Sequence, residues 1–170
     1  MWKVNTSNRD KLREFEKYLG SVSSQTTDLD EPDADLITVI QYKASQFDQV
    51  VVDDTSLEID GVEAGVNIKW LLAELPSLIG RRASFTCLLG IARNSQVEVF
   101  RGEVAGTIVS ARGDSFGFNN HFLPTGRLKT FGEEIPADLN PRKIAVDRLL
   151  SGEAWKTLPL LKTWDGKFQG

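Results

Sequence analysis

Hydrophobic and polar residues follow one another with two different periods along the chain, which predicts both helices and strands. In some stretches apolar residues recur every three or four positions, as Leu12, Phe15 and Leu19 do, and this spacing is typical of a helix with one buried face. Other stretches are short, apolar and β-branched, such as Val50-Val51-Val52, and they indicate buried strands. The elements expected in the first part of the chain are strands at 1–7, 22–27 and 49–52 and helices at 9–19 and 33–47.

The rest of the chain is predicted to continue in the same mixed manner. A hairpin-like stretch is expected from Leu57 to Val66, and a helix is expected to begin near Ile68. The elements expected after it are strands at 85–93 and 97–109, a Gly-, Pro- and Asn-rich loop region with short strands at 110–140, and a last helix at 141–150. Because helices and strands do not alternate strictly, we expect an α/β fold on a central mixed, twisted sheet, in a single domain over residues 1–170.

Length and composition exclude several classes of protein. The chain has 170 residues, of which 41% are hydrophobic, and this is enough to form a core without disulfides. Intrinsic disorder, a collagen-like repeat and a membrane span are therefore excluded. A formal charge of −4, with no cluster of Lys and Arg, argues against a protein that coats nucleic acid. The first residues lack the apolar stretch of a signal peptide, so we expect a cytoplasmic protein.

A single cysteine and a single histidine limit the metal chemistry. Cys87 has no partner for an internal disulfide, and its apolar neighbours predict a core position. His121 lies among Asn and Phe residues and is expected to be structural. A site with several histidines is excluded, so any metal is expected to be a hard ion held by carboxylates, Mg²⁺ or Mn²⁺.

The start of the helix predicted at 9–19 has the features of an anion-binding site. Thr6, Ser7 and Asn8 lie between the first strand and this helix, where free backbone amides and the positive end of the helix dipole favour negative charge. Lys11, one turn into the helix, adds a positive charge. An ordinary polar helix cap is the alternative, and the Gly-Lys-Ser/Thr pattern of a Walker loop is missing.

Two lysines lie next to apolar residues. Lys43 shares a helix face with Ile40, where burial of its ammonium group costs several kcal/mol unless an anion is close. Lys69 lies beside Ile68 and Trp70 at the start of a helix. The alternative for such residues is a side chain at the edge of the apolar stripe that extends to solvent.

Two acidic residues, Asp53 and Asp54, follow the apolar strand predicted at 49–52. Ligands of α/β proteins bind at the carboxyl ends of strands, and adjacent residues of a strand point to opposite faces, so one of the two is expected in a site. With Glu31, that carboxylate has the chemistry to hold Mg²⁺ against a phosphate. An exposed acidic turn is the alternative.

An aromatic loop, Phe116-Gly117-Phe118-Asn119, follows Arg112-Gly113. An aromatic ring beside a glycine is suited to stack on a flat base. A loop aromatic that closes the core is the alternative.

The order of these features resembles the inosine triphosphate pyrophosphatase family, enzymes that hydrolyse ITP, dITP and XTP. The resemblance covers nearly the whole chain. The matching segments are Thr6-Ser7-Asn8-Arg9-Asp10-Lys11 followed by Leu12 and Glu14-Phe15, Asp28-Leu29-Asp30-Glu31, Lys43-Ala44, Asp53-Asp54-Thr55-Ser56-Leu57, Gly65 with Ile68-Lys69-Trp70, Phe100-Arg101-Gly102 and Gly106, Arg112-Gly113, Phe116-Gly117, and Lys129-Thr130-Phe131 with Glu133.

The resemblance implies a Mg²⁺-dependent reaction in which water attacks the α-phosphorus and yields a nucleoside monophosphate and pyrophosphate. It implies that Glu31 and Asp54 bind the metal and that Asp54 also orients or deprotonates the water. It implies two lobes around a nucleotide-binding cleft, and usually a homodimer. The substrate contacts that it implies are Thr6, Ser7, Asn8, Arg9, Asp10, Lys11, Lys43, Thr55, Lys69, Phe116, Gly117, Phe118, Asn119 and Arg142.

The chain departs from the family pattern around the implied base pocket. The family typically has Phe-Gly-Trp-Asp-Pro where this chain has Phe116-Gly117-Phe118-Asn119-Asn120, and Ser-His-Arg where it has Asn140-Pro141-Arg142. A base-contacting lysine is missing near Pro136, and Lys143 and Arg127 are candidates to replace its charge.

These departures bear on base choice. A pocket that hydrogen-bonds a base edge discriminates by about 10⁴ or more, whereas an apolar slot manages about 10². We therefore expect hydrolysis with relaxed or altered base choice. The alternatives are the same reaction on a different or broader set of nucleotides, and a nucleotide-binding protein that has lost catalysis.

Overall fold

A computed structural model of the chain describes residues 1–62, 69–115 and 117–169, with residues 69 and 70 described by their backbone alone. In these ranges the chain forms a seven-stranded mixed sheet of order β2-β1-β3-β4-β5-β6, in which β7 also pairs with β5. The α/β fold on a mixed sheet is confirmed. The strands are β1 Trp2–Asn5, β2 Val22–Gln25, β3 Val50–Ile59, β4 Arg82–Arg93, β5 Gln96–Ile108, β6 Phe122–Pro124 and β7 Lys156–Pro159, and the α-helices are α1 Arg9–Leu19, α2 Leu36–Ser45, α3 Lys69–Glu74 and α4 Pro141–Ser151.

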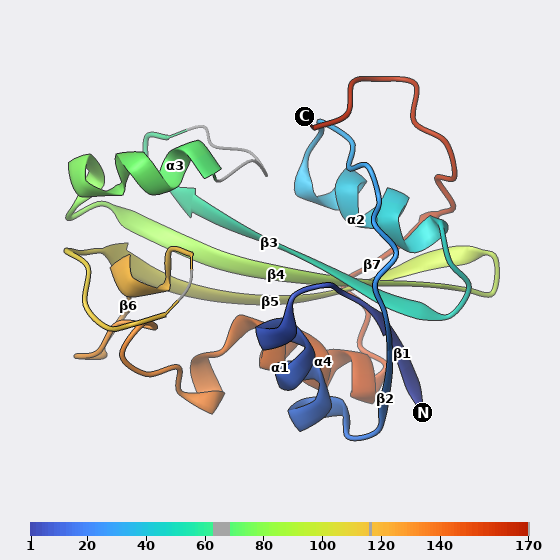
Figure 1. Cartoon of the computed structure of the whole chain (residues 1–170), viewed down its shortest axis with the longest axis horizontal. Coiled ribbons are helices and arrows are strands. Elements are labelled where there is room, and N and C mark those ends of the chain that lie inside the picture. The colour runs from blue at the N-terminus through green and yellow to red at the C-terminus, as the bar shows by residue number, and fades with distance from the viewer. Residues whose placement is uncertain (63–68, 116, 170) are drawn as a thin grey trace.

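The long antiparallel strands β3, β4 and β5 run the length of the molecule (Figure 1). At one end, α2 covers one face of these strands, while α1 and α4 cover the other (Figure 1). At the opposite end lie α3 and β6, so the elements fall into two groups joined by the strands (Figure 1). β1 is parallel to both β2 and β3, which makes the first group the parallel part of the sheet.

The helix periodicity of the sequence corresponds to the buried faces. From α2, Ile40 and Ala44 pack on Val52 and Leu88. On the other face, Phe15 of α1 belongs to the cluster that holds the buried cysteine, Cys87, and the last turns of α4. α4 lies close to β5 because position 102 is glycine; a Cβ there would meet the carbonyl oxygen of Pro141 at 1.9 Å.

The strand predicted at 49–52 is longer than expected. β3 continues through both aspartates to Ile59, so the prediction that Asp53 and Asp54 follow the end of a strand is wrong. The polar residues from Asp53 onward do not follow a strand pattern in the sequence, but all of them up to Ile59 pair with β4. β3 pairs with β1 only at Val50 and Val51, so the parallel pairing ends just before the aspartates.

Other boundaries differ by a few residues. The second helix spans residues 36–45 rather than 33–47, because Asp35 Oδ1 accepts the amide of Thr38 at 2.9 Å and caps the helix. The stretch predicted as a hairpin begins within β3 and closes in a bridge between Ile59 and Val62; residues 63–66 lie outside the described residues. Ile68 also lies outside them, and α3 begins at the next position.

The structural roles predicted for Cys87 and His121 are confirmed. Cys87 is fully buried. His121 Nδ1 lies 3.0 Å from the carbonyl oxygen of Val109, beside β6. Among the helices that the structure describes, none is long and apolar enough to cross a membrane.

Candidate functional site

A hollow of about 540 Å³ lies where β1 ends and β3 continues alone on its outer edge. Its walls come from the β1–α1 connection, the β2–α2 connection, α2 and β3. The lining residues are Asn5, Thr6, Ser7, Asn8, Lys11, Thr26, Thr27, Asp28, Leu29, Glu31, Lys43 and Asp53. Most of the implied phosphate and metal contacts are therefore neighbours in space.

The start of α1 is held together by its own side chains. Thr6 Oγ1 accepts the amide of Asn8 at 3.2 Å, and Asn8 Oδ1 accepts the amides of Asp10 and Lys11 at 2.9 and 3.1 Å. The prediction of free amides is wrong for these three groups, because the cap consumes them. The groups at the start of α1 that remain able to bind an anion are hydroxyl and amide side chains and the Lys11 ammonium group, together with the helix dipole.

Asp53 lies at the centre of a buried ionic network. Its Oδ2 is 3.1 Å from Lys11 Nζ and 3.1 Å from an Arg142 guanidinium nitrogen. The second terminal nitrogen of Arg142 is 2.6 Å from Glu14 Oε2. Burial alone would raise the pKa of Asp53, but the charges of Lys11 and Arg142 outweigh it and hold the pKa well below its ordinary value. The network joins α1, β3 and the first turn of α4.

Lys43 meets the anions that its buried position requires. Its Nζ lies 3.1 Å from Glu31 Oε1 and donates to the backbone oxygen of Asp53 at 2.8 Å. Burial would lower the pKa of Lys43, but the carboxylates of Asp54, Asp53 and Glu31 outweigh it and raise the pKa. The alternative of a lysine that extends to solvent is therefore excluded.

Because adjacent residues of a strand point to opposite faces, Asp54 faces away from the Asp53 network, and its carboxylate is under the charges of Lys43 and Glu31. Burial raises the pKa of Asp54 to about 6, with Lys43 lowering it and Glu31 raising it further. Lys43 offsets the repulsion between these two carboxylates only in part, because the pKa of Asp54 stays raised, and a divalent ion would reduce the repulsion further.

The donor set fits a hard divalent ion. Glu31 and Asp54 are oxygen donors, and Mg²⁺ typically takes one or two protein carboxylates and completes its shell with water and substrate phosphates. In the ranges the structure describes, no group of three or more His, Cys, Asp or Glu is arranged to hold a metal. A protein cage of the zinc or calcium kind is absent from that part of the chain, while a two-carboxylate site fits it.

A second, smaller hollow of about 120 Å³ shares Lys11 with the first. It is lined by Lys11, Glu14, Thr55, Phe85, Gly117, Phe118, Asn119, Phe131, Ile135, Asn140, Pro141 and Arg142. Arg142 is 6% exposed, and its Nε has no hydrogen-bond partner among the described residues. A buried donor without a partner is costly, so Arg142 lines this hollow with a guanidinium group whose hydrogen-bonding capacity is not fully used.

The aromatic loop contributes to this second hollow in part. The ring of Phe118 is 5% exposed and packs edge-on against Phe85 at 4.6 Å, so it closes the core and presents one side to the hollow. Phe116, the residue expected to stack on a base, lies outside the described residues. Asn119 Nδ2 donates to Ser115 Oγ at 3.2 Å, which fixes its amide within the loop.

Among the predicted residues whose side chains the structure describes, Asp54, Arg9 and Asp10 line neither hollow. Arg9 is exposed at the start of α1. Asp10 pairs with Arg13 at the surface, at 3.7 Å. Lys69 begins α3, and the structure describes its backbone alone.

The departure at the start of α4 has a structural explanation. Asn140 Oδ1 accepts the amides of Arg142 and Lys143, so Asn140 is a helix cap, and Pro141 stands in the first helical position that proline favours. Lys143 and Arg127 do not replace the missing lysine. They pair with surface carboxylates, Asp147 at 2.7 Å and Asp138 at 2.6 Å, and neither lines the hollow.

Sequence reasoning assigned no role to Glu14, and it expected only one of Asp53 and Asp54 in the site. A signal for Glu14 existed, because Glu14 follows Lys11 by three positions and shares its helix face. Its partner Arg142 is 128 residues away, and one sequence carries no signal for such a contact.

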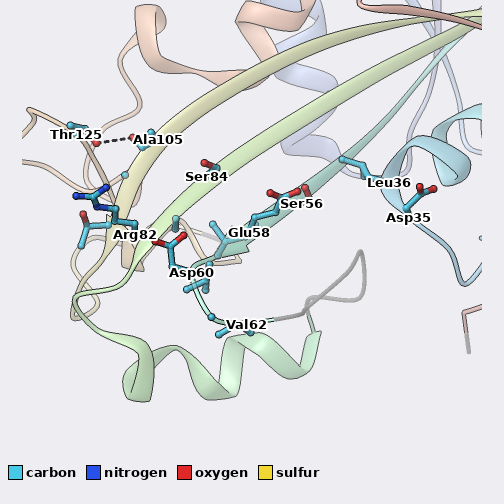
Figure 2. Close-up of a pocket in the computed structure, with 16 residues that line it drawn as sticks. Asp35, Leu36, Ser56, Glu58, Asp60, Val62, Arg82, Ser84, Ala105 and Thr125 are labelled. Carbon is cyan, nitrogen blue, oxygen red and sulfur yellow. Dashed lines mark hydrogen bonds between the residues drawn. The ribbon is translucent and has the colours of Figure 1, made fainter.

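A larger hollow, of about 990 Å³, lies over the other half of the sheet, between the start of α2 and the turn after β3. Figure 2 shows its lining, with Glu58 on β3, Arg82 on the neighbouring strand β4 and Asp60 in the turn after β3. None of the lysines of the network lines it. Size alone therefore does not mark the candidate site.

Comparison with known proteins gives a consistent result. A family model described as the Ham1 family matches residues 3–151. The chain is 33% identical over 181 residues to a dITP/XTP pyrophosphatase of Pyrobaculum aerophilum, covering 91% of this chain and 95% of that protein. It is 30% identical over 153 residues to a dITP/XTP pyrophosphatase of Hyperthermus butylicus, covering 76% and 80%. Among solved structures, the Staphylococcus aureus Ham1 protein matches with a TM-score of 0.71 at 22% identity, covering 89% of this chain and 98% of that one, which supports the fold.

Proposed function

The chain belongs to the Ham1 family, and on this premise we propose that it is a nucleoside triphosphate pyrophosphatase that acts on non-canonical purine nucleotides such as ITP, dITP and XTP. Water attacks the α-phosphorus, the bond from that phosphorus to the bridging oxygen breaks, and a nucleoside monophosphate and pyrophosphate result. The observation that carries the proposal is the gathering of Lys11, Lys43, Glu31 and Asp53 around one hollow, with the Asp54 carboxylate beside Lys43 and Glu31.

The two lysines supply the positive charge that the triphosphate requires. Lys11 reaches the hollow from α1 and Lys43 from α2, so the phosphates would lie between two helices. Each ammonium group is already held by a carboxylate, Asp53 for Lys11 and Glu31 for Lys43. Held in this way, both charges are in place before the substrate arrives, which is how an enzyme stabilises a charged transition state at little reorganisation cost.

Enzymes of this kind use a divalent metal, and we propose Mg²⁺ here, with Mn²⁺ as a substitute. Glu31 and Asp54 would hold it. When bound, the ion would neutralise phosphate charge and polarise the phosphoryl group. Asp54 would also orient the attacking water and accept its proton, because its carboxylate is the one on which the charges of Lys43 and Glu31 act.

The smaller hollow would take the base. Arg142 lines this hollow with a guanidinium group, which is a donor and never an acceptor, and it favours a carbonyl oxygen at the purine 6-position, as in hypoxanthine and xanthine, over the amino group of adenine. Guanine carries the same carbonyl. Pro141, in place of the family's histidine, brings no hydrogen-bonding side chain to reject its extra amino group. We therefore expect preference for 6-oxo purines with weakened rejection of GTP.

The test is pyrophosphate release by the purified protein with Mg²⁺ across ITP, dITP, XTP, GTP, ATP and pyrimidine triphosphates. The expected order is ITP and XTP first, GTP next and ATP last. An order led by ATP or by a pyrimidine would contradict the role of Arg142. If no nucleotide is turned over while ITP still binds, the chain is a nucleotide-binding protein without catalysis.

Assembly and location remain predictions. We propose a homodimer, as is usual for the family, and native mass measurement by light scattering tests it: a mass near twice 18.9 kDa supports it, and a mass near 18.9 kDa contradicts it. The predicted cytoplasmic location and the absence of nucleic-acid partners rest on the sequence.

A further inference from the structure

The segment after α4 lies beyond the residues that the family model matches, which end at 151. It first forms β7, which pairs antiparallel with β5 from Lys156↔Val99 to Pro159↔Gln96. It then continues as residues 160–169, here called the tail, which run around α2 and end beside the start of that helix (Figure 1). The tail therefore reaches the same end of α2 as the connection that carries Glu31.

Hydrogen bonds fix the first half of the tail to α2. Gln41 Nε2 donates to the backbone oxygen of Pro159 at 2.8 Å, just before the tail. The amide of Leu161 donates to Ser45 Oγ at 2.8 Å, and Gln46 Nε2 donates to the backbone oxygen of Lys162 at 3.1 Å. These contacts lie along α2 and involve none of the candidate site residues.

The second half of the tail bonds to the connection between β2 and α2. The amide of Gln169 donates to the backbone oxygen of Glu31 at 2.7 Å, and Gln169 Nε2 donates to that of Pro32 at 3.0 Å. The amide of Asp33 donates to the backbone oxygen of Lys167 at 2.8 Å. Between these bonds, the Phe168 ring lies edge-on to Tyr42 of α2 at 5.9 Å.

Other backbone support for this connection is lacking where the structure describes it. Of the described residues, those at 28–34 make backbone-to-backbone hydrogen bonds with other segments only through Lys167 and Gln169. Glu31 is otherwise held by its side chain, through Lys43 at 3.1 Å. The backbone position of Glu31 thus depends on the tail.

We propose that the tail is a positioning element that fixes Glu31 for metal binding. The inference rests on the proposed function, in which Glu31 is a metal ligand. Groups that orient a metal ligand from outside the coordination shell typically change metal affinity by about 10–100-fold when they are removed. The tail orients Glu31 through hydrogen bonds to the backbone at Glu31 and its neighbours. Without the tail, the connection between β2 and α2 would have to become ordered when the metal binds, and this would weaken metal binding.

A matched pair of substitutions isolates the main contact. Gln169→Pro removes the backbone donor to Glu31 together with the side chain, whereas Gln169→Ala removes the side chain alone. Gln41→Ala serves as a control, because it removes an anchor near Pro159 that does not touch the Glu31 connection. A form that lacks residues 166–170 removes the whole contact, and thermal unfolding reports whether each variant is folded.

Two measurements test the proposal without turnover. One is Mn²⁺ binding, followed by the loss of its free-ion magnetic resonance signal, and the other is hydrogen exchange of the peptide that covers residues 28–36. We expect Gln169→Pro and the shortened form to bind Mn²⁺ about 10-fold more weakly and to exchange faster in that peptide. Gln169→Ala is expected to change both much less, and Gln41→Ala to change neither.

Glu31→Gln separates this proposal from the proposed function. If Mn²⁺ binds the unaltered protein and Glu31→Gln weakens it, the metal site stands. Unchanged Mn²⁺ binding in both Gln169→Pro and the shortened form would then overturn the role of the tail alone. If Glu31→Gln has no effect on Mn²⁺ binding, the assignment of Glu31 fails and the role of the tail fails with it.

Discussion

Replacing Asp53 by Asn tests the ionic network at the centre of the site. The substitution keeps the size of the side chain and removes its charge. Asp53 is 4% exposed, and it lies 3.1 Å from both Lys11 and Arg142. Removing one partner of a buried ion pair costs about 3–5 kcal/mol, because the remaining charge stays buried without compensation.

The structure places the expected loss at the lower end of that range. Arg142 keeps Glu14 at 2.6 Å, and Lys11 is 21% exposed and reaches water. We therefore expect Asp53→Asn to lower the free energy of unfolding by about 3 kcal/mol, a large share of the roughly 5–15 kcal/mol of a typical domain.

Urea unfolding at pH 7 measures this loss. The control is Asp138→Asn, which breaks an exposed pair with Arg127 and is expected to cost at most about 1 kcal/mol. A loss for Asp53→Asn no larger than that of the control would contradict this expectation. It would mean that the network does not hold the charges of Lys11 and Arg142 in a buried, coupled state.

The stability difference between the unaltered protein and Asp53→Asn is also expected to change with pH in a defined direction. Burial would raise the pKa of Asp53, but Lys11 and Arg142 outweigh it, so the pKa in the folded state lies well below its value of about 3.9 in the unfolded chain. A carboxylate with a lowered pKa stabilises the fold above the unfolded value, and loses this effect as the pH falls toward the folded one. The difference between the unaltered protein and Asp53→Asn should be constant from about pH 5 to 7 and narrow below about pH 4. A difference that grows in acid contradicts this.

Three further predictions follow from single features. Burial raises the pKa of the Cys87 thiol to about 12, so a disulfide reagent at pH 8 should not modify the native protein. The same reagent should modify one thiol per chain in urea, and rapid labelling of the native protein would contradict the burial of Cys87. Gly102→Ala places a Cβ 1.9 Å from the carbonyl oxygen of Pro141 and should lower the free energy of unfolding by about 1–3 kcal/mol or more, measured in urea; an unchanged midpoint would show that α4 is not packed so closely on β5. Chelation with EDTA should stop pyrophosphate release and excess Mg²⁺ should restore it, and turnover that persists in EDTA argues against the two-carboxylate metal site.

The regular parts of the fold are predicted well from the sequence, for a physical reason. The spacing of Leu12, Phe15 and Leu19 corresponds to a helix with one buried face. The continuous apolar run Val50-Val51-Val52 corresponds to a strand that is buried on both faces. Local pattern failed within β3, where Asp53 and Asp54 continue the strand. Pairing with β4 keeps these polar residues in the sheet, and that pairing depends on a strand more than 25 positions away.

The candidate site was predictable where neighbours in sequence make it, and not where distant segments meet. The cluster around Thr6 to Lys11 is local, and Lys43 was expected to need an anion because of its buried helix face. The contacts that complete the site are long-range. Arg142 reaches Glu14 across 128 positions, and Gln169 reaches Pro32 across 137. No period or spacing in a single sequence encodes such pairs.

The most direct test of the account is the turnover of ITP by Asp54→Asn in the presence of Mg²⁺. Loss of a positioned base typically lowers the rate by about 10²–10⁴-fold, and here a metal contact is lost as well, so we predict a fall in pyrophosphate release of at least about 100-fold. Circular dichroism and urea unfolding should stay close to those of the unaltered protein, because Lys11, Lys43 and the Asp53 network remain in place. Sustained turnover in a folded Asp54→Asn protein would contradict the assignment of the reaction to this site.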